Sequence, residues 1–152
     1  MEPSSDTPYI LAAATNVAEQ SERKILQINY DGTIDEIQWE PARRVQSVWF
    51  INSQRIYTAG GGVYVRNADR TWERVLEMSD YYTWRIRGSA ANDVFVTGTF
   101  GFVGNYNGVN WQVIGSDLSS SKYFYFIDCQ SYLTVVVGEN NCQGVISIIR
   151  RQ

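Results

Sequence analysis

Residues 92–98 of the chain read NDVFVTG, residues 105–108 read NYNG, and Trp111 follows. An apolar run that ends in glycine, followed by a turn sequence and a second short apolar run, is typical of antiparallel strands joined by hairpins. The same order occurs upstream, where QRIYTAG occupies residues 54–60 and a tryptophan stands at position 72. This stretch therefore predicts four short strands rather than a helix.

The strand-and-turn pattern repeats along the chain. The glycines that end the two apolar runs are 38 residues apart, and the two tryptophans are 39 apart. The strand-then-glycine element returns as SYLTVVVG at 131–138, and a hairpin-then-tryptophan element covers YDGTI at 30–34 with Trp39. A period near 40 residues with four short strands is the blade length of a β-propeller. We predict an all-β, β-propeller-type array of about four antiparallel blades.

The period divides the chain into units at 9–44, 45–81, 82–122 and 123–152, after a disordered segment at 1–8. The predicted strands cover residues 9–14, 24–30, 34–39, 45–51, 55–59, 63–67, 71–76, 82–87, 94–99, 102–106, 111–114, 123–127, 132–137 and 145–150. Both end units are incomplete, because the first lacks an innermost strand and the last lacks an outermost one.

Turn chemistry gives two further expectations. The dipeptides DG at 31–32 and NG at 107–108 are typical of two-residue hairpins, which require positive φ at both positions. The glycines that end the apolar runs are expected where the chain turns sharply, which glycine does without steric penalty.

Residues 86–98, IRGSAANDVFVTG, together with YNGVNW at 106–111, resemble a bacterial propeller repeat. That repeat reads W-G-S-x-x-N-D-V-Y-A-V-G and then H-Y-D-G-x-x-W, and it occurs in propellers related to the Asp-box and photosystem-assembly-factor types. Arg87 departs from it at the tryptophan position, whereas Trp49 keeps the tryptophan in the second unit. The resemblance implies a propeller fold and a binding role, with no catalytic motif to carry over.

Composition narrows the function classes. The 152 residues include no histidine, which excludes Ser–His–Asp and Cys–His nucleophile systems and histidine-ligated metals. With 13 basic against 16 acidic residues, the net charge of −3 gives no basic footprint for nucleic acid. We predict no cofactor, no metal site and no catalytic residue. No apolar run approaches the ~20 residues of a membrane helix, and the N-terminal residues lack the pattern of a signal peptide.

The two cysteines, Cys129 and Cys142, lie before and after one predicted strand of the last unit. A strand of about seven residues would separate them by ~20 Å, and a disulfide needs Cα atoms within ~7 Å. We predict two free thiols, which favour the cytoplasm, although the sequence leaves the compartment open.

Propeller geometry gathers the loops between second and third strands on the same face as the crossovers between blades. The candidate binding residues on this face are Arg43, Asp80, Tyr81, Phe100, Asn140 and Asn141. We predict a non-catalytic scaffold that binds a protein partner there, or that associates with itself through its end blades. A lectin-like propeller that binds a glycan is the alternative, and a glycoside hydrolase fragment built around Tyr81, Tyr82, Arg85 and Arg87 is the least favoured.

Overall fold

The computed structural model describes residues 8–15, 23–41, 43–52, 54–78, 81–117 and 120–150, which form fourteen strands and one short 3-10 helix. The strands are β1 (Tyr9–Thr15), β2 (Arg23–Asn29), β3 (Ile34–Ile37), β4 (Val45–Asn52), β5 (Arg55–Gly60), β6 (Gly62–Arg66), β7 (Trp72–Arg74), β8 (Thr83–Ala90), β9 (Asp93–Gly98), β10 (Val103–Tyr106), β11 (Trp111–Gly115), β12 (Lys122–Gln130), β13 (Leu133–Asn140) and β14 (Gln143–Arg150). Helix η1 (Leu76–Met78) follows β7 and begins at the last residue of the strand predicted at 71–76.

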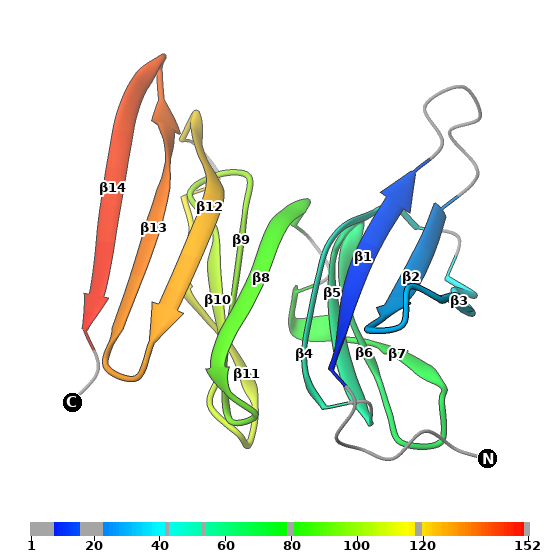
Figure 1. Cartoon of the computed structure of the whole chain (residues 1–152). Helices are drawn as coiled ribbons and strands as arrows, with labels where there is room; N and C mark the ends of the chain where they lie inside the picture. Colours follow the sequence, from blue (N-terminus) through cyan, green and yellow to red (C-terminus); the bar gives the residue numbers. More distant parts are fainter. Residues whose placement is uncertain are drawn as a thin grey trace.

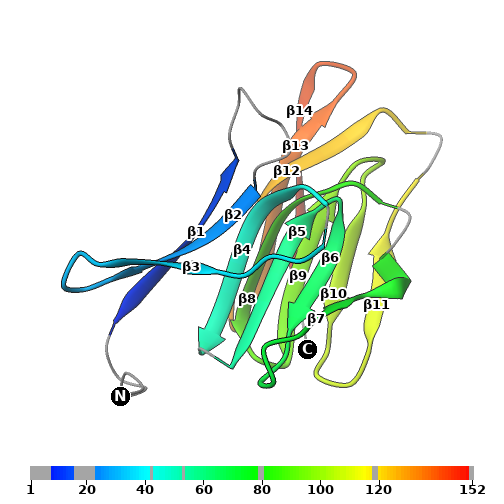
Figure 2. The same ribbon diagram turned by 90° about the vertical axis from the view of Figure 1, so that its right-hand side faces the viewer.

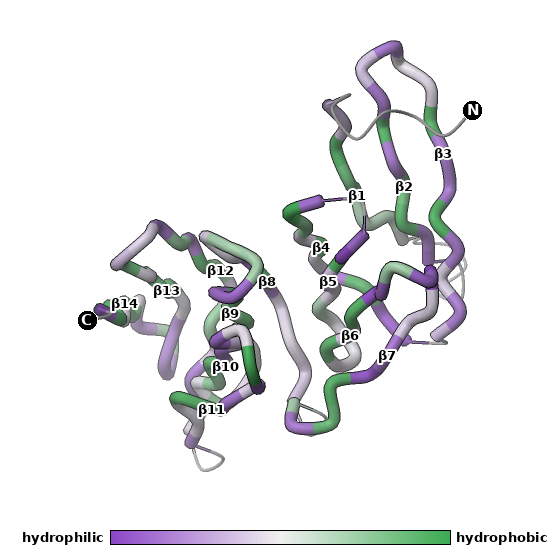
Figure 3. The backbone as a smooth tube through the Cα atoms, turned by 90° about the horizontal axis from the view of Figure 1, so that it is seen from below, coloured by the Kyte–Doolittle hydropathy of each residue, from purple (hydrophilic) through white to green (hydrophobic). Residues whose placement is uncertain are grey.

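The strands form four antiparallel sheets, each built from consecutive strands. We call them blade 1 (β1–β3), blade 2 (β4–β7), blade 3 (β8–β11) and blade 4 (β12–β14). The blades follow one another in an open arc, and blades 1 and 4 lie at its two ends (Figures 1 and 3). The prediction of an all-β array of four blades with incomplete end blades is confirmed.

The first strands of neighbouring blades lie against one another. β8 packs against β4 and β12, and all three lie toward the viewer in Figure 1. Each interface between blades holds one apolar cluster, because strand alternation gives every blade two apolar faces. Examples are Ile25 with Ile56 between blades 1 and 2, Tyr57 with Ile86 between blades 2 and 3, and Phe95 with Phe124 between blades 3 and 4.

Strand register shows which positions of the blades correspond. Residue Ile28 pairs with Ile34 across β2 and β3, Arg66 pairs with Trp72 across β6 and β7, and Tyr106 pairs with Trp111 across β10 and β11. β1 therefore corresponds to β5 and β9, and among the described residues blade 1 has no counterpart of the first strands β4 and β8.

The correspondence corrects the sequence repeat in blade 1. Ile34, rather than Trp39, takes the position of Trp72 and Trp111. Trp39 instead lies beyond the end of β3, where its ring packs edge-on against Trp72 at 4.8 Å between centroids. Its indole N–H donates to the Arg43 carbonyl oxygen at 3.0 Å.

The turn at 29–33 is not the two-residue hairpin that its DG sequence predicts. Gly32 has a φ of 83°, but Asp31 does not share the positive φ, because its carboxylate accepts hydrogen bonds from the Thr33 N–H and hydroxyl at 2.9 and 2.6 Å. The turn spans five residues and is closed by the Asn29 N–H donating to the Thr33 carbonyl at 2.9 Å. The NG turn is likewise longer than predicted, since only Gly108 of the pair has a positive φ.

The glycines at the end of β5 and β9 and near the end of β13 have a different role from the one predicted. A Cβ on Gly60, Gly98 or Gly138 would lie 1.9, 2.3 or 1.7 Å from a carbonyl oxygen at the start of the first strand of the same blade. Close approach of two backbones, rather than a sharp turn, therefore requires glycine at these positions.

Cys129 near the end of β12 and Cys142 in the β13–β14 turn lie at opposite ends of β13, and both thiols are free. The segment predicted to be disordered, 1–8, lies outside the described residues except for Pro8. In the part of the chain that the structure describes, no helix has the length and apolar character to cross a membrane.

Candidate functional site

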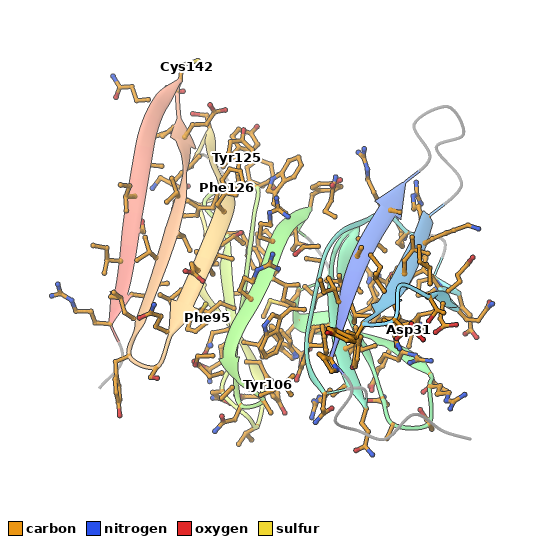
Figure 4. The ribbon with its side chains drawn as sticks, in the orientation of Figure 1. Asp31, Phe95, Tyr106, Tyr125, Phe126 and Cys142 are labelled. Atoms are coloured by element: carbon orange, nitrogen blue, oxygen red, sulfur yellow. The ribbon has the colours of Figure 1, made fainter. Side chains whose placement is uncertain are left out.

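The turns that join second to third strands do lie beside the crossovers between blades. The Gly61 N–H donates to the Arg44 carbonyl at 2.8 Å, and the Gly101 N–H donates to the Lys122 carbonyl at 2.8 Å. In blade 4 the Ser121 hydroxyl lies 3.1 Å from the Asn140 side-chain oxygen. We call this end of the molecule the loop face; Cys142 marks it in Figure 4, and Tyr106 lies near the opposite end.

The predicted residues occupy different parts of the loop face. The Ser121 hydroxyl lies within hydrogen-bond distance of the side-chain oxygens of both Asn140 and Asn141. Tyr81 stacks on Phe102 with ring centroids 4.1 Å apart, and its hydroxyl donates to Ser116 at 3.2 Å.

Two further predicted residues lie apart from those. The Phe100 carbonyl accepts from the Asp117 N–H at 2.8 Å, so the β9–β10 turn holds the crossover to blade 4. Arg43 is exposed beside Gly61 on blade 2. Asp80 lies outside the described residues.

Three residues other than glycine, at the β9–β10 and β13–β14 turns, have a left-handed backbone conformation. Their φ angles are 58° for Phe100, 51° for Asn141 and 62° for Cys142. For a bulky residue such as phenylalanine this conformation costs roughly 1–2 kcal/mol. Such conformations persist where the surrounding structure holds them and occur disproportionately at functional sites.

A feature that the sequence did not reveal lies beside these turns. Each complete first strand carries a β-bulge at the same position, between Val45 and Ser47, between Thr83 and Arg85, and between Phe124 and Phe126. The extra residues at these bulges are Gln46, Trp84 and Tyr125. A bulge bends its strand and changes the direction of its side chain, and bulges are common next to binding and active sites.

The three bulged residues lie together. With Arg85 and Phe126 they line a hollow of about 230 Å³ on the inner strands, which we call the bulge pocket. Trp84 contacts Tyr125 edge-on at 5.5 Å between ring centroids and Tyr82 at 4.9 Å. Tyr125 and Phe126 lie in the half of the molecule toward Cys142 (Figure 4).

The polar groups of the pocket are mainly donors. The indole N–H of Trp84 is buried and finds no acceptor among the described residues. The Arg85 guanidinium lies 5.4 Å from the Phe126 ring centroid, and Gln46 donates its amide N–H to the Tyr82 hydroxyl at 2.7 Å. A ligand that offers an acceptor and an apolar group would fit these neighbours.

Tyr125 is fixed by a carboxylate. Its hydroxyl donates to Glu139 at 2.8 Å, and this hydrogen bond, with a smaller contribution from burial, raises the pKa of Tyr125. A raised pKa disfavours the phenolate that a tyrosine nucleophile would need.

The tyrosine and arginine cluster weighed for a glycoside hydrolase does not converge. Tyr81 faces Ser116 and Tyr82 faces Gln46. Arg85 stacks on Phe126, whereas Arg87 is half-buried and donates to Ser47 and to the Val48 carbonyl. Burial, with repulsion from Arg85, lowers the pKa of Arg87.

Two other hollows lie between neighbouring blades. One of about 260 Å³ lies between blades 3 and 4 and includes Lys122 and Ile149. The larger, about 340 Å³, lies between blades 2 and 3 and includes Arg55, which already stacks on Tyr57 and Tyr106.

Over the described ranges, no cluster of three or more acidic or cysteine side chains is arranged to hold a metal ion. Burial raises the pKa of the Cys129 thiol to about 11, so this cysteine is a packing residue rather than a reactive thiolate.

Solved structures resemble the chain, whereas no family model and no curated protein match it. One, described as YCF48 from Cyanidioschyzon merolae, has a TM-score of 0.65 at 15% identity. The match covers 98% of this chain and 52% of the neighbour's chain. Another, described as YCF48 bound to D1 peptide, has a TM-score of 0.63 at 15% identity. That match covers 85% of this chain and 44% of the neighbour's chain. The chain thus spans about half the length of these neighbours. At this identity the likeness concerns the fold, and it confirms the prediction of a β-propeller-type array.

Proposed function

We propose that the chain is a non-catalytic propeller scaffold that binds an extended segment of a protein partner at its loop face. The observation that carries the proposal is the bulge pocket, where Gln46, Trp84 and Tyr125 come together from three blades. One neighbour is described as YCF48 bound to D1 peptide, so a propeller of this kind is compatible with a peptide ligand.

The chemistry of the pocket favours a particular kind of segment. Trp84 and Phe126 offer aromatic surface, and the Trp84 N–H and the Arg85 guanidinium offer donors. A peptide with an apolar or proline side chain next to a backbone carbonyl or carboxylate would use both. The predicted residues Phe100, Asn140 and Asn141 would then border the partner.

A non-catalytic role is supported by the same geometry. Tyr125 has a raised pKa because of Glu139, and Arg85 and Arg87 point to different partners. None of these groups is placed to activate a nucleophile or to stabilise developing charge in the pocket.

The test is an array of tethered peptides probed with the purified chain and with Trp84→Gln, which places the blade 2 residue at this position. Val109→Gln, in the exposed β10–β11 turn at the opposite end, is the matched control. We expect peptide signals that fall at least about tenfold in the Trp84 variant, because packing of a peptide side chain on the indole ring and the indole N–H donor are both lost. The control should bind like the parent.

A glycan array is run in parallel. Glycan signals that depend on Trp84, without peptide signals, would contradict the proposal and favour the lectin alternative. Circular dichroism of each variant establishes that a lost signal reflects the pocket rather than unfolding.

A further inference from the structure

The two ends of the arc each present an apolar sheet surface to solvent. On blade 4, cross-strand pairing puts Val137 opposite Ile146 and Val135 opposite Ile148 on the side away from blade 3. We define the tail face by the exposed apolar residues Leu133, Val137, Ile146 and Ile148.

Blade 1 carries the second surface. Residue Ile10 pairs with Ile28, and Ile28 pairs with Ile34, so the three side chains share the side of the sheet away from blade 2. With Leu26 they define the head face; Figure 2 views the strands β1, β2 and β3 that carry it from the side of blade 1.

The exposure of residues at corresponding positions in the other blades shows that such faces are normally covered by a neighbouring blade. On the tail side, Ile25, Val63 and Val103 correspond to Ile146 by register, and they are at most 4% exposed because the next blade covers them. Ile146 keeps a large apolar side chain at this position but is 68% exposed. The tail face is therefore a blade-stacking surface without its next blade.

The head face shows the same contrast in the other direction. Ile56, Val94 and Thr134 correspond to Ile10, and they are at most 2% exposed because the preceding blade covers them. Ile10 is 67% exposed. A tail face and a head face thus meet at every interface inside the chain, and one of each is left over.

We propose that a second copy of this chain covers both faces, with the tail face of each copy stacked on the head face of the other. The contact repeats the stacking of second and third strands that is present at three internal interfaces, although blade 1 brings no first strand to it. Two copies related by a twofold axis would use the contact twice and close an eight-bladed ring.

The test is native mass by light scattering coupled to size exclusion over a concentration series of the chain. We expect a dimer that dissociates on dilution. Ile146→Glu on the tail face and Ile10→Glu on the head face should each raise the dissociation constant about 100-fold, because each buries an unpaired carboxylate in an apolar contact. Both side chains are exposed within one chain, so the variants should fold. Val109→Glu adds the same charge at an exposed site on neither face and should leave the dimer unchanged.

Mixing the variants identifies the arrangement. Ile10→Glu retains an intact tail face and Ile146→Glu an intact head face, so a mixture should form mixed dimers more tightly than either variant alone. A monomer at all concentrations, or an open-ended polymer, would overturn the closed dimer. Loss of association in Ile146→Glu without any loss in Ile10→Glu would overturn it too, since that result describes tail-to-tail pairing.

Discussion

The two ends of the blades differ in which features recur from one repeat to the next: side-chain hydrogen bonds recur at one end, whereas backbone bulges recur at the other. At the end away from the loop face, the turns at 29–33 and 67–71 are 38 residues apart and have the same hydrogen bonds. Asp69 accepts from the Thr71 N–H and hydroxyl at 3.0 and 2.7 Å, as Asp31 does from Thr33. At the loop face, the corresponding bulged residues are glutamine, tryptophan and tyrosine.

The difference has a physical reason. The turn at the far end depends on its own side chains, because a side-chain oxygen of the aspartate accepts from the backbone N–H two residues later and closes the turn. The bulge at the loop face depends on backbone geometry, since the glycine on the neighbouring strand makes room for it whatever the bulged side chain is. The loop face can therefore vary its side chains while the blade stays the same, as a binding surface requires.

The largest effect is expected from filling the space beside a bulge. In Gly138→Ala the new Cβ would lie 1.7 Å from the Tyr123 carbonyl oxygen, so the two strands must separate. We expect a loss of about 3 kcal/mol in the free energy of unfolding, at the upper end of overpacking costs. Urea denaturation followed by circular dichroism measures it.

Gly144→Ala is the matched control in the same blade. A Cβ at Gly144 meets no atom within 4 Å, so the free energy of unfolding should change by less than about 0.5 kcal/mol. Equal losses in the two variants would show that the bulge does not need its glycine.

The sequence predicted much of this architecture but not its details. Fourteen apolar runs bounded by turn residues located all fourteen strands, because strand alternation and turn chemistry are local properties. The bulges were missed because a bulge adds one residue to a strand without any compositional signal. Trp39 was misplaced in the repeat because its tryptophan matched by type, whereas the strand pairing that selects Ile34 is not visible in the sequence.

The candidate site was predicted only in outline. The loop face followed from propeller geometry, and the contacts of Tyr81, Phe100 and Asn141 with the last crossover agree with that location. Its binding role stays a prediction. The convergence of Gln46, Trp84 and Tyr125 could not be seen, because it depends on how three blades stack.

A smaller effect on stability is expected from exchanging the left-handed residues of the turns at 29–33 and 67–71, which we call the twin turns. Arg70 has a φ of 71° where its counterpart Gly32 has 83°, so the second turn holds a non-glycine residue in left-handed backbone. Arg70→Gly should stabilise the chain by about 0.5 kcal/mol, because relief of backbone strain exceeds the added freedom of the unfolded chain.

Gly32→Ala is the reciprocal change and should destabilise the chain by about 1 kcal/mol. Thermal unfolding of both variants at one pH measures the difference. If both changes shift the midpoint in the same direction, the two turns do not impose the same backbone.

The smallest effect concerns the carboxylates that cap the twin turns. Hydrogen bonds from the Thr33 hydroxyl and N–H lower the pKa of Asp31, and those from the Thr71 hydroxyl and N–H lower the pKa of Asp69. A folded-state pKa below the unfolded value means that the carboxylates contribute stability above about pH 4 and lose it as pH falls through the lowered pKa. Asp31→Asn with Asp69→Asn should therefore lower the free energy of unfolding at pH 6 and reduce its fall between pH 5 and 2.

Because the asparagine side-chain oxygen can still accept from threonine, the difference in stability reports the charge of the carboxylates and not the loss of the turn. A pH profile of unfolding parallel to that of the parent would mean that the two caps carry no linked proton.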